Sequence, residues 1–139
     1  MKRLMFTFIV LAGVILFACS KDDDNGEATP FDLLTAHTWV SDSLLADGED
    51  AGGEGQLLHN FNGDVQFRAD GTGNFGEYTG SWSLSDDNQE ITINTNELPI
   101  PIVAAIVELN ELSLKITTAF PDMNNPGVII DIRMTFRKK

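Results

Sequence analysis

The sequence predicts an all-β domain, an antiparallel up-and-down barrel of about eight strands that follows a lipoprotein signal peptide. From residue 39 onward, apolar and polar residues alternate in short runs, as in antiparallel strands with one face in water. Gly, Asp and Asn separate these runs, and no long segment has the 3.6-residue period of a helix. Most connections are short, which favours pairing of consecutive strands and closure of the sheet into a barrel.

The N-terminal segment has the pattern of a signal peptide. Lys2 and Arg3 precede an apolar run over residues 4–17, which is shorter than the roughly 20 residues that cross a bilayer. The segment Leu16-Phe17-Ala18-Cys19 resembles a bacterial lipobox, which implies cleavage before Cys19 and acylation of its thiol. Cys19 is the only cysteine, so the lipid on Cys19 is the predicted membrane attachment. The alternative is an uncleaved N-terminal helix.

Residues 20–24 point to the location of the mature protein. Ser-Lys-Asp-Asp-Asp at these positions resembles the surface-export signal of Bacteroidota-type lipoproteins, which implies the outer membrane and the cell surface. The alternative is that the acidic stretch is a solvated tether of a lipoprotein that faces the periplasm. The predicted organisation is a signal peptide (1–18), an acylated cysteine with a flexible acidic tether (19–30) and one barrel domain (31–139).

The net charge limits the possible partners. The formal charge is −12, and removal of Lys2 and Arg3 with the signal peptide brings it to −14. Nucleic-acid binding needs basic patches that displace counterions, so no nucleic acid is expected as a partner. With a single cysteine that is acylated, no disulfide forms within the chain. The domain therefore depends on its hydrophobic core.

The strands are expected in order along the chain, after one helical turn at residues 31–34. A Gly-rich acidic loop spans residues 46–56, and residues 57–61 form either a short strand or part of that loop. A Pro-containing loop covers residues 120–127. The expected strands are residues 39–44, 65–69, 74–78, 80–84, 90–94, 103–109, 112–118 and 128–137.

Several of these segments resemble the bacterial lipocalin-like lipoprotein domains. A Leu-Thr-Gly-like lead precedes Trp39, with Ala36 where Gly is usual, and an apolar strand ends in Asp-Gly-Thr-Gly at residues 70–73. Gly-x-Trp-x-Leu at residues 80–84 is followed by an acidic turn, and an Ile-x-x-Leu step precedes a Leu-x-Leu strand at residues 112–114. The resemblance spans residues 33–137 and implies a barrel that binds a small apolar ligand. The Pro-Ile-Pro stretch at residues 99–101 departs from the pattern.

The candidate ligand-binding residues are the apolar side chains expected inside the barrel. An eight-stranded barrel either fills with side chains or holds one small ligand. The two alternatives are therefore a ligand-binding barrel and a dry barrel that acts as a protein-interaction or accessory module, whose protein partner the sequence does not identify. The dry barrel would use residues 98–103 or the acidic loop as its contact surface. The candidate interior residues are Trp39, Phe67, Phe75, Trp82, Ile93, Leu114, Ile132, Met134 and Phe136.

Catalytic and metal-binding chemistry is not expected. The chain has two histidines, His37 and His59, and no Gly-x-Ser-x-Gly motif, so we expect no enzyme, no metal and no cofactor. The acids of the loop at residues 46–56 either gather around a cation or form a solvated surface.

Overall fold

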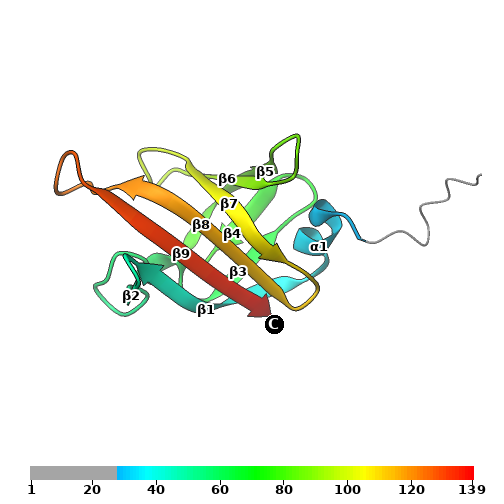
Figure 1. Cartoon of the computed structure of the whole chain (residues 1–139). Coiled ribbons are helices and arrows are strands. Elements are labelled where there is room, and N and C mark those ends of the chain that lie inside the picture. Colours follow the sequence, from blue (N-terminus) through cyan, green and yellow to red (C-terminus); the bar gives the residue numbers. More distant parts are fainter. Residues whose placement is uncertain (1–27) are drawn as a thin grey trace, which may run out of the picture.

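The computed structural model describes residues 28–139, which form a closed antiparallel barrel (Figure 1). The predicted signal peptide, Cys19 and most of the predicted tether lie outside the described residues. Eight strands pair with their neighbours in the sequence β1-β3-β4-β5-β6-β7-β8-β9, and β9 pairs with β1 to close the ring. This confirms the predicted fold class. Among residues 28–139, no helix is long and apolar enough to span a membrane.

The elements follow the alternating segments of the sequence. A short helix, α1 (Pro30–Ala36), precedes the barrel, and a 3₁₀ turn, η2 (His59–Phe61), lies between β2 and β3. β2 pairs only with the end of β1. The strands are β1 (Thr38–Ala46), β2 (Glu49–Asp50), β3 (Asp64–Phe67), β4 (Thr72–Phe75), β5 (Tyr78–Leu84), β6 (Glu90–Thr95), β7 (Ile102–Leu109), β8 (Ser113–Pro121) and β9 (Ile129–Lys138).

The clearest difference from the predicted strands lies at residues 74–78. The strand expected at residues 74–78 is β4 followed by a turn, because Gly76 takes a φ of 63° and reverses the chain before Tyr78. Asp70 explains the early start of β4, since its Oδ1 accepts hydrogen bonds from the backbone N–H and the hydroxyl of Thr72 at 2.9 and 2.7 Å. Residues 57–61 form no strand and instead contain η2.

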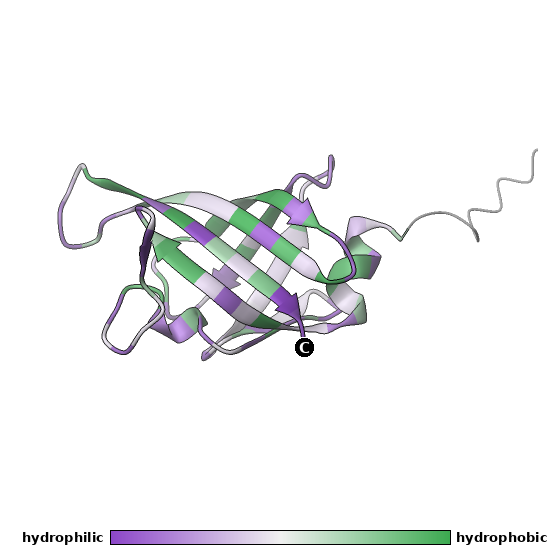
Figure 2. Ribbon diagram, turned by 60° about the horizontal axis from the view of Figure 1, so that its bottom comes forward, coloured by the Kyte–Doolittle hydropathy of each residue, from purple (hydrophilic) through white to green (hydrophobic). Residues whose placement is uncertain are grey.

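The barrel interior is packed with apolar side chains. Hydrophobic and polar residues alternate along the strands (Figure 2), and every buried side chain of the described chain belongs to a hydrophobic residue. Phe67 packs edge-to-face on Phe75 and Trp82, with ring centroids 5.6 and 5.2 Å apart. These contacts form the centre of the core.

Helix α1 closes one end of the barrel, which we call the helix end. Thr29 and Asp32 form a reciprocal capping box that starts the helix, and Leu34 is fully buried. The Trp39 indole Nε1 donates to the Leu34 carbonyl at 3.1 Å, and the Trp82 indole Nε1 donates to the Arg68 carbonyl at 2.9 Å. Both indoles therefore satisfy their polar atom within the chain.

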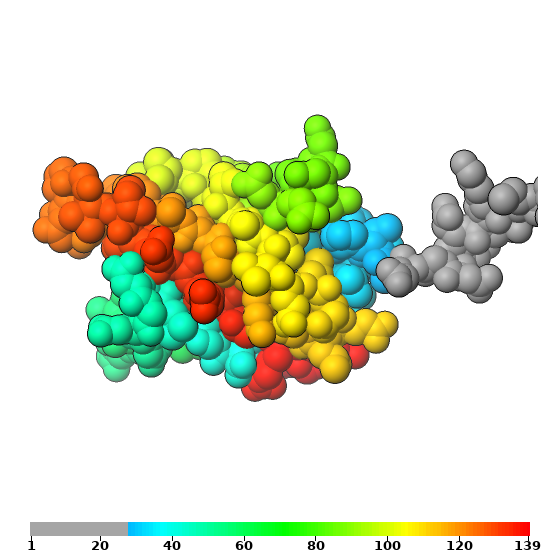
Figure 3. All heavy atoms as spheres, viewed as in Figure 1, coloured from blue at the N-terminus to red at the C-terminus, as the bar shows by residue number. Residues whose placement is uncertain are grey.

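The opposite end, which we call the lid end, is covered by chain connections. It consists of residues 47–63 after β1, the β4–β5 turn and the β6–β7 and β8–β9 connections. In Figure 3 the β8–β9 connection (orange) and the segment after β1 lie away from α1 (blue). Ala51, Leu58 and Phe61 are buried in this cover, so residues 47–63 contribute in part to the core.

Candidate functional site

A small apolar cavity lies at the lid end of the barrel. Its volume is about 40 Å³, whereas pockets for drug-sized ligands enclose roughly 300–1,000 Å³. Tyr78 and Thr118 supply the only side-chain polar groups of its lining. A larger guest would need the cover to move. The lining residues are Leu57, Leu58, Phe61, Tyr78, Leu98, Ile102, Thr118, Phe120, Ile132 and Met134.

Residues 56–61, which we call the lid, form one wall of this cavity. Leu58 is buried, with 2% of its surface exposed, whereas the adjacent Leu57 is 52% exposed. The Leu58 N–H donates to the Ala51 carbonyl at 2.8 Å, and the Asn60 carbonyl accepts from the Glu77 N–H at 2.7 Å. These hydrogen bonds and the buried side chains of Leu58 and Phe61 hold the lid on the barrel.

Tyr78 connects the lid to the barrel wall. Its phenol accepts a hydrogen bond from Asn60 Nδ2 at 3.2 Å, and its ring packs edge-to-face on Phe61 with centroids 4.9 Å apart. In this arrangement the phenolic hydrogen is available to donate to another acceptor. Tyr78 is also the only tyrosine of the chain.

Two buried side-chain polar atoms of the described chain lack a hydrogen-bond partner, and both belong to the lid end. They are Nδ1 of His59, in the lid, and Oγ1 of Thr95, the last residue of β6. Thr95 follows Ile91 and Ile93 on the inward face of β6 and pairs with Gly80, which has no side chain. Unpaired buried polar atoms are rare in folded proteins, and an ordered water commonly satisfies such atoms.

The two ends of the barrel differ in charge. The lid-end connections contain no Lys or Arg within the described chain, and they carry the carboxylates of Asp47, Glu49, Asp50, Glu54, Glu77, Glu97 and Asp122. Five of the six Lys and Arg residues in 28–139 lie at or near the helix end, namely Arg68, Lys115, Arg137, Lys138 and Lys139. The lid end of the barrel is therefore acidic.

The nine interior residues expected from the sequence are all buried, but the structure places them in different parts of the barrel. Ile132 and Met134 line the lid-end cavity. The remaining seven are core residues that do not line the cavity, and Trp39 and Trp82 lie at the helix end. These seven are Trp39, Phe67, Phe75, Trp82, Ile93, Leu114 and Phe136.

Most of the cavity lining was not expected from the sequence. Leu57, Leu58 and Phe61 stand in a Gly-rich segment without strand alternation, although their apolar character alone could have indicated a buried loop. Residues 98–103 were expected to be either a contact patch or core, and the structure divides them. Ile102 is 4% exposed and lines the cavity, whereas Ile100 and Val103 are 40% and 48% exposed.

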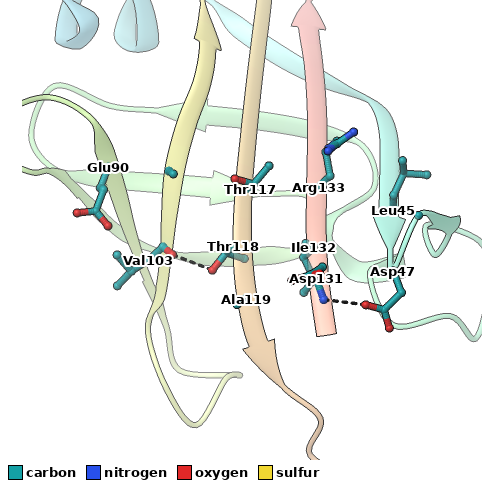
Figure 4. Close-up of a pocket in the computed structure, with 12 residues that line it drawn as sticks. Leu45, Asp47, Glu90, Val103, Thr117, Thr118, Ala119, Asp131, Ile132 and Arg133 are labelled. Carbon is teal, nitrogen blue, oxygen red and sulfur yellow. Dashed lines mark hydrogen bonds between the residues drawn. The ribbon is translucent and has the colours of Figure 1, made fainter. Parts of the chain in front are cut away.

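A second concave region lies on the outer wall of the barrel (Figure 4). This outer groove measures about 760 Å³ and crosses β7, β8, β9 and the end of β1. The outward side chains of Ala105, Thr117 and Ala119 form its floor, and Val103 and Arg133 border it. Asp47 Oδ1 accepts from the Asp131 N–H at 2.9 Å and holds the loop after β1 against β9.

The described residues contain no assembled catalytic or metal centre. His37 is the C-cap of α1 and His59 lies in the lid, so the two histidines are at opposite ends of the barrel. No group of three or more His, Cys, Asp or Glu residues in 28–139 is arranged to hold a metal ion. The acids at residues 46–56 are thus not gathered around a common centre.

The carboxylates with shifted pKa values belong to turns and strand ends. A hydrogen bond from the Thr72 hydroxyl lowers the pKa of Asp70, and one from the Ser85 hydroxyl lowers the pKa of Asp87. The pKa of Glu108 is lowered mainly by the Ser113 hydroxyl, and that of Asp122 by the Asn125 amide. Asp70 and Asp87 are exposed, Glu108 and Asp122 are partly exposed, and each of the four carboxylates fixes a turn or strand pair.

Comparison with known proteins identifies the fold. No protein-family model matches the chain, and no curated protein matches it by sequence. A bovine odorant binding protein complexed with its natural ligand superimposes with a TM-score of 0.55 at 16% identity, over 81% of this chain and 75% of that one. The complex of bovine odorant binding protein with undecanal gives a TM-score of 0.54 at 16% identity, over the same shares.

A bovine odorant binding protein with a selenium-containing odorant matches at a TM-score of 0.53 and 15% identity, over 81% of this chain and 74% of that chain. Identities this low establish the fold alone. The superpositions and the closed strand order show that this chain is an eight-stranded lipocalin-like barrel.

Proposed function

We propose that this chain is a lipid-anchored binding protein of the outer membrane whose barrel takes up a small apolar ligand beneath the lid. The observation that carries the proposal is the apolar cavity between the lid and the barrel wall. The odorant binding proteins of similar fold were solved with small ligands, one of them undecanal. Uptake requires the lid to swing outward, because the closed cavity measures only about 40 Å³.

Binding, rather than catalysis, fits the residues of this site. The cavity lining contains no charged side chain and no histidine, and Tyr78 is its only titratable group, with no second acid or base beside it in the lining. The free energy of binding would come from burial of apolar surface against the lid and the barrel wall.

The anchoring part of the proposal rests on the lipobox-like residues around Cys19. Acylation of Cys19 would hold the protein in the membrane, since each buried CH₂ contributes about 0.8 kcal/mol. The first described residues lead into α1, at the end of the barrel opposite the lid (Figure 1). An anchored barrel would thus turn its lid end away from the membrane. The export-like residues 20–24 favour the cell surface over the periplasmic face.

The ligand site can be tested with the chain's single tyrosine. We expect the resonance of fluorotyrosine at Tyr78 to shift saturably when the neutral apolar dye Nile red is added, while the indole N–H signals of Trp39 and Trp82 stay in place. Leu98→Trp should block the cavity and abolish dye binding, because Leu98 lines it. Leu84→Trp, a matched change of another partly buried leucine, should leave binding intact. An equal loss of dye binding in Leu98→Trp and Leu84→Trp would contradict a lid-end site.

The anchor requires a separate test in the native cell. An alkyne-labelled palmitate should be incorporated into the wild-type chain and not into a Cys19→Ala variant. Protease added to intact cells should degrade a surface-exposed barrel. Labelling of the Cys19→Ala variant would contradict anchoring at this residue, and protection from protease would place the barrel on the periplasmic side.

The outer groove favours a second candidate function, that of a protein-interaction module. Its floor of small side chains and its exposed Val103 form a concave surface that another protein could fill. A photo-crosslinking residue in place of Ala119 should then capture a specific partner in the native envelope, and the same residue in place of the exposed Ser83 of β5 should not. Identical products from both positions would argue against this function.

A further inference from the structure

The outer face of β7, β8 and β9 contains the outer groove, and we infer that this face binds a second copy of the chain in a two-fold symmetric dimer. The inference rests on the second candidate function, whose partner it names, and it does not depend on the ligand site. Its basis is an apolar sheet face with opposite charges at its two borders.

The outer wall of the barrel is apolar on one side and polar on the other. Among the exposed large hydrophobic residues of the described chain, those that lie on strands are Val103, Val107 and Ile129, all on β7 or β9. An exposed apolar face on adjacent strands is typical of a protein-contact surface. The outward side chains of β4, β5 and β6 are polar, namely Thr72, Asn74, Thr79, Ser81, Ser83, Glu90, Thr92 and Asn94.

The floor of the outer groove allows a second sheet to approach closely. The outward side chains of Ala105, Thr117 and Ala119 are small, and the larger Val103 stands beside them with 48% of its surface exposed. In a dimer, Val103 of each copy would project into the groove of the other copy. This contact removes apolar surface of both copies from water and supplies the affinity.

Two oppositely charged residues lie at the ends of one row across this face. Glu90 of β6 pairs with Ala105 of β7. Ala105 pairs with Thr117 of β8, which in turn pairs with Arg133 of β9. Figure 4 shows Glu90 and Arg133 on opposite sides of the groove, and three strand spacings separate their backbones by roughly 14 Å. Within residues 28–139, neither side chain forms an ion pair.

This charge arrangement is complementary to itself under a two-fold rotation. An axis that lies between the two copies and runs along β7 and β8 places Arg133 of each copy opposite Glu90 of the other. The rotation keeps the strand direction, so both helix ends face the same side, which agrees with the proposed anchoring of both copies in one membrane. Exposed ion pairs contribute little affinity, so these two pairs fix the orientation of the dimer.

Charge reversal tests the dimer on the full chain. Two copies with different tags are produced together in the native cell, dissolved in mild detergent and captured through one tag. Wild-type copies should co-purify. Arg133→Glu in both copies, or Glu90→Arg in both copies, should lower the co-purified fraction at least about tenfold, because each change brings like charges together twice. One copy with Arg133→Glu and one with Glu90→Arg should associate again, because this combination restores both ion pairs.

Arg137→Glu is the matched control, because it makes the same charge change at the helix end of β9. It should leave co-purification at the wild-type level. The inference would be overturned by wild-type copies that do not co-purify, by single variants that associate as the wild type does, or by a mixed pair that fails to associate.

The same experiment separates this inference from the proposed functions. A chain that does not associate with itself but binds Nile red would overturn the dimer and leave the ligand site in place. Capture of a different protein from position 119, without association between copies, would overturn the dimer and leave the second candidate function in place. Loss of dye binding in a chain that still dimerises would overturn the ligand site alone.

Discussion

The indole Nε1 of Trp39 donates a 3.1 Å hydrogen bond to the carbonyl of Leu34, and both residues are completely buried. This bond connects the first barrel strand to the helix that closes the end. A buried carbonyl that loses its hydrogen-bond donor destabilises the folded state, because it has been removed from water and has no partner in the protein. The helix end is therefore fixed by a specific bond as well as by apolar contact, whereas the lid end has unpaired polar atoms and a cavity.

Trp39→Phe should destabilise the barrel by about 1–3 kcal/mol, because it leaves the Leu34 carbonyl unpaired and removes part of a packed ring system. Urea unfolding of the two proteins measures the difference. His37→Ala is the control, since His37 contacts the Trp39 ring edge-on, with centroids 6.1 Å apart, without forming that bond. A larger loss of unfolding free energy in His37→Ala than in Trp39→Phe would show that ring packing, rather than the hydrogen bond, dominates.

The barrel could be predicted from the sequence because alternation is a local signal. Trp82 and Leu84, or Ile91 and Ile93, mark the inward face of a strand through their spacing alone. The lid could not be predicted in this way. Leu58 and Phe61 are buried by tertiary contact with β5, β7 and the strands near them, and the Gly-rich segment around them has no period that indicates burial. The polarity of the cavity likewise depends on residues far apart in the chain, such as Tyr78 and Thr118.

The close approach of β5 and β6 makes Gly80 essential. A Cβ on Gly80 would lie 1.9 Å from the Asn94 carbonyl oxygen, and the obstacle is backbone that has to shift. Gly80→Ala should lower the free energy of unfolding by at least about 3 kcal/mol and strongly lower the midpoint of thermal unfolding. Gly127→Ala is the matched control, because its φ of 87° costs about 1–2 kcal/mol of strain while no atom lies within 4 Å of the new Cβ. Comparable losses in the two variants would contradict a steric requirement at Gly80.

The lid leucines allow a comparison of neighbouring residues. Leu58→Ala should destabilise the protein by about 2–5 kcal/mol, because Leu58 is 2% exposed and its loss enlarges the cavity. Leu57→Ala should cost much less, since Leu57 is 52% exposed. Hydrogen exchange should increase in residues 51–61 of Leu58→Ala first. Uniform acceleration over all strands would mean that the lid does not open separately from the barrel.

The turn after β5 predicts part of the acid sensitivity. The Ser85 hydroxyl and the Gln89 N–H donate to Asp87 Oδ1 at 2.6 and 3.1 Å and lower the pKa of Asp87 below its usual 3.8. A carboxyl whose pKa is lowered by folding stabilises the protein above the unfolded value and loses this contribution as the pH falls through the folded value. Asp87→Asn should therefore reduce stability at neutral pH and make the decline below about pH 4 shallower. Urea midpoints from pH 7 to pH 2 measure this slope, with Asp86→Asn as the neighbouring control. An unchanged slope in Asp87→Asn would show that the turn contributes nothing to acid unfolding.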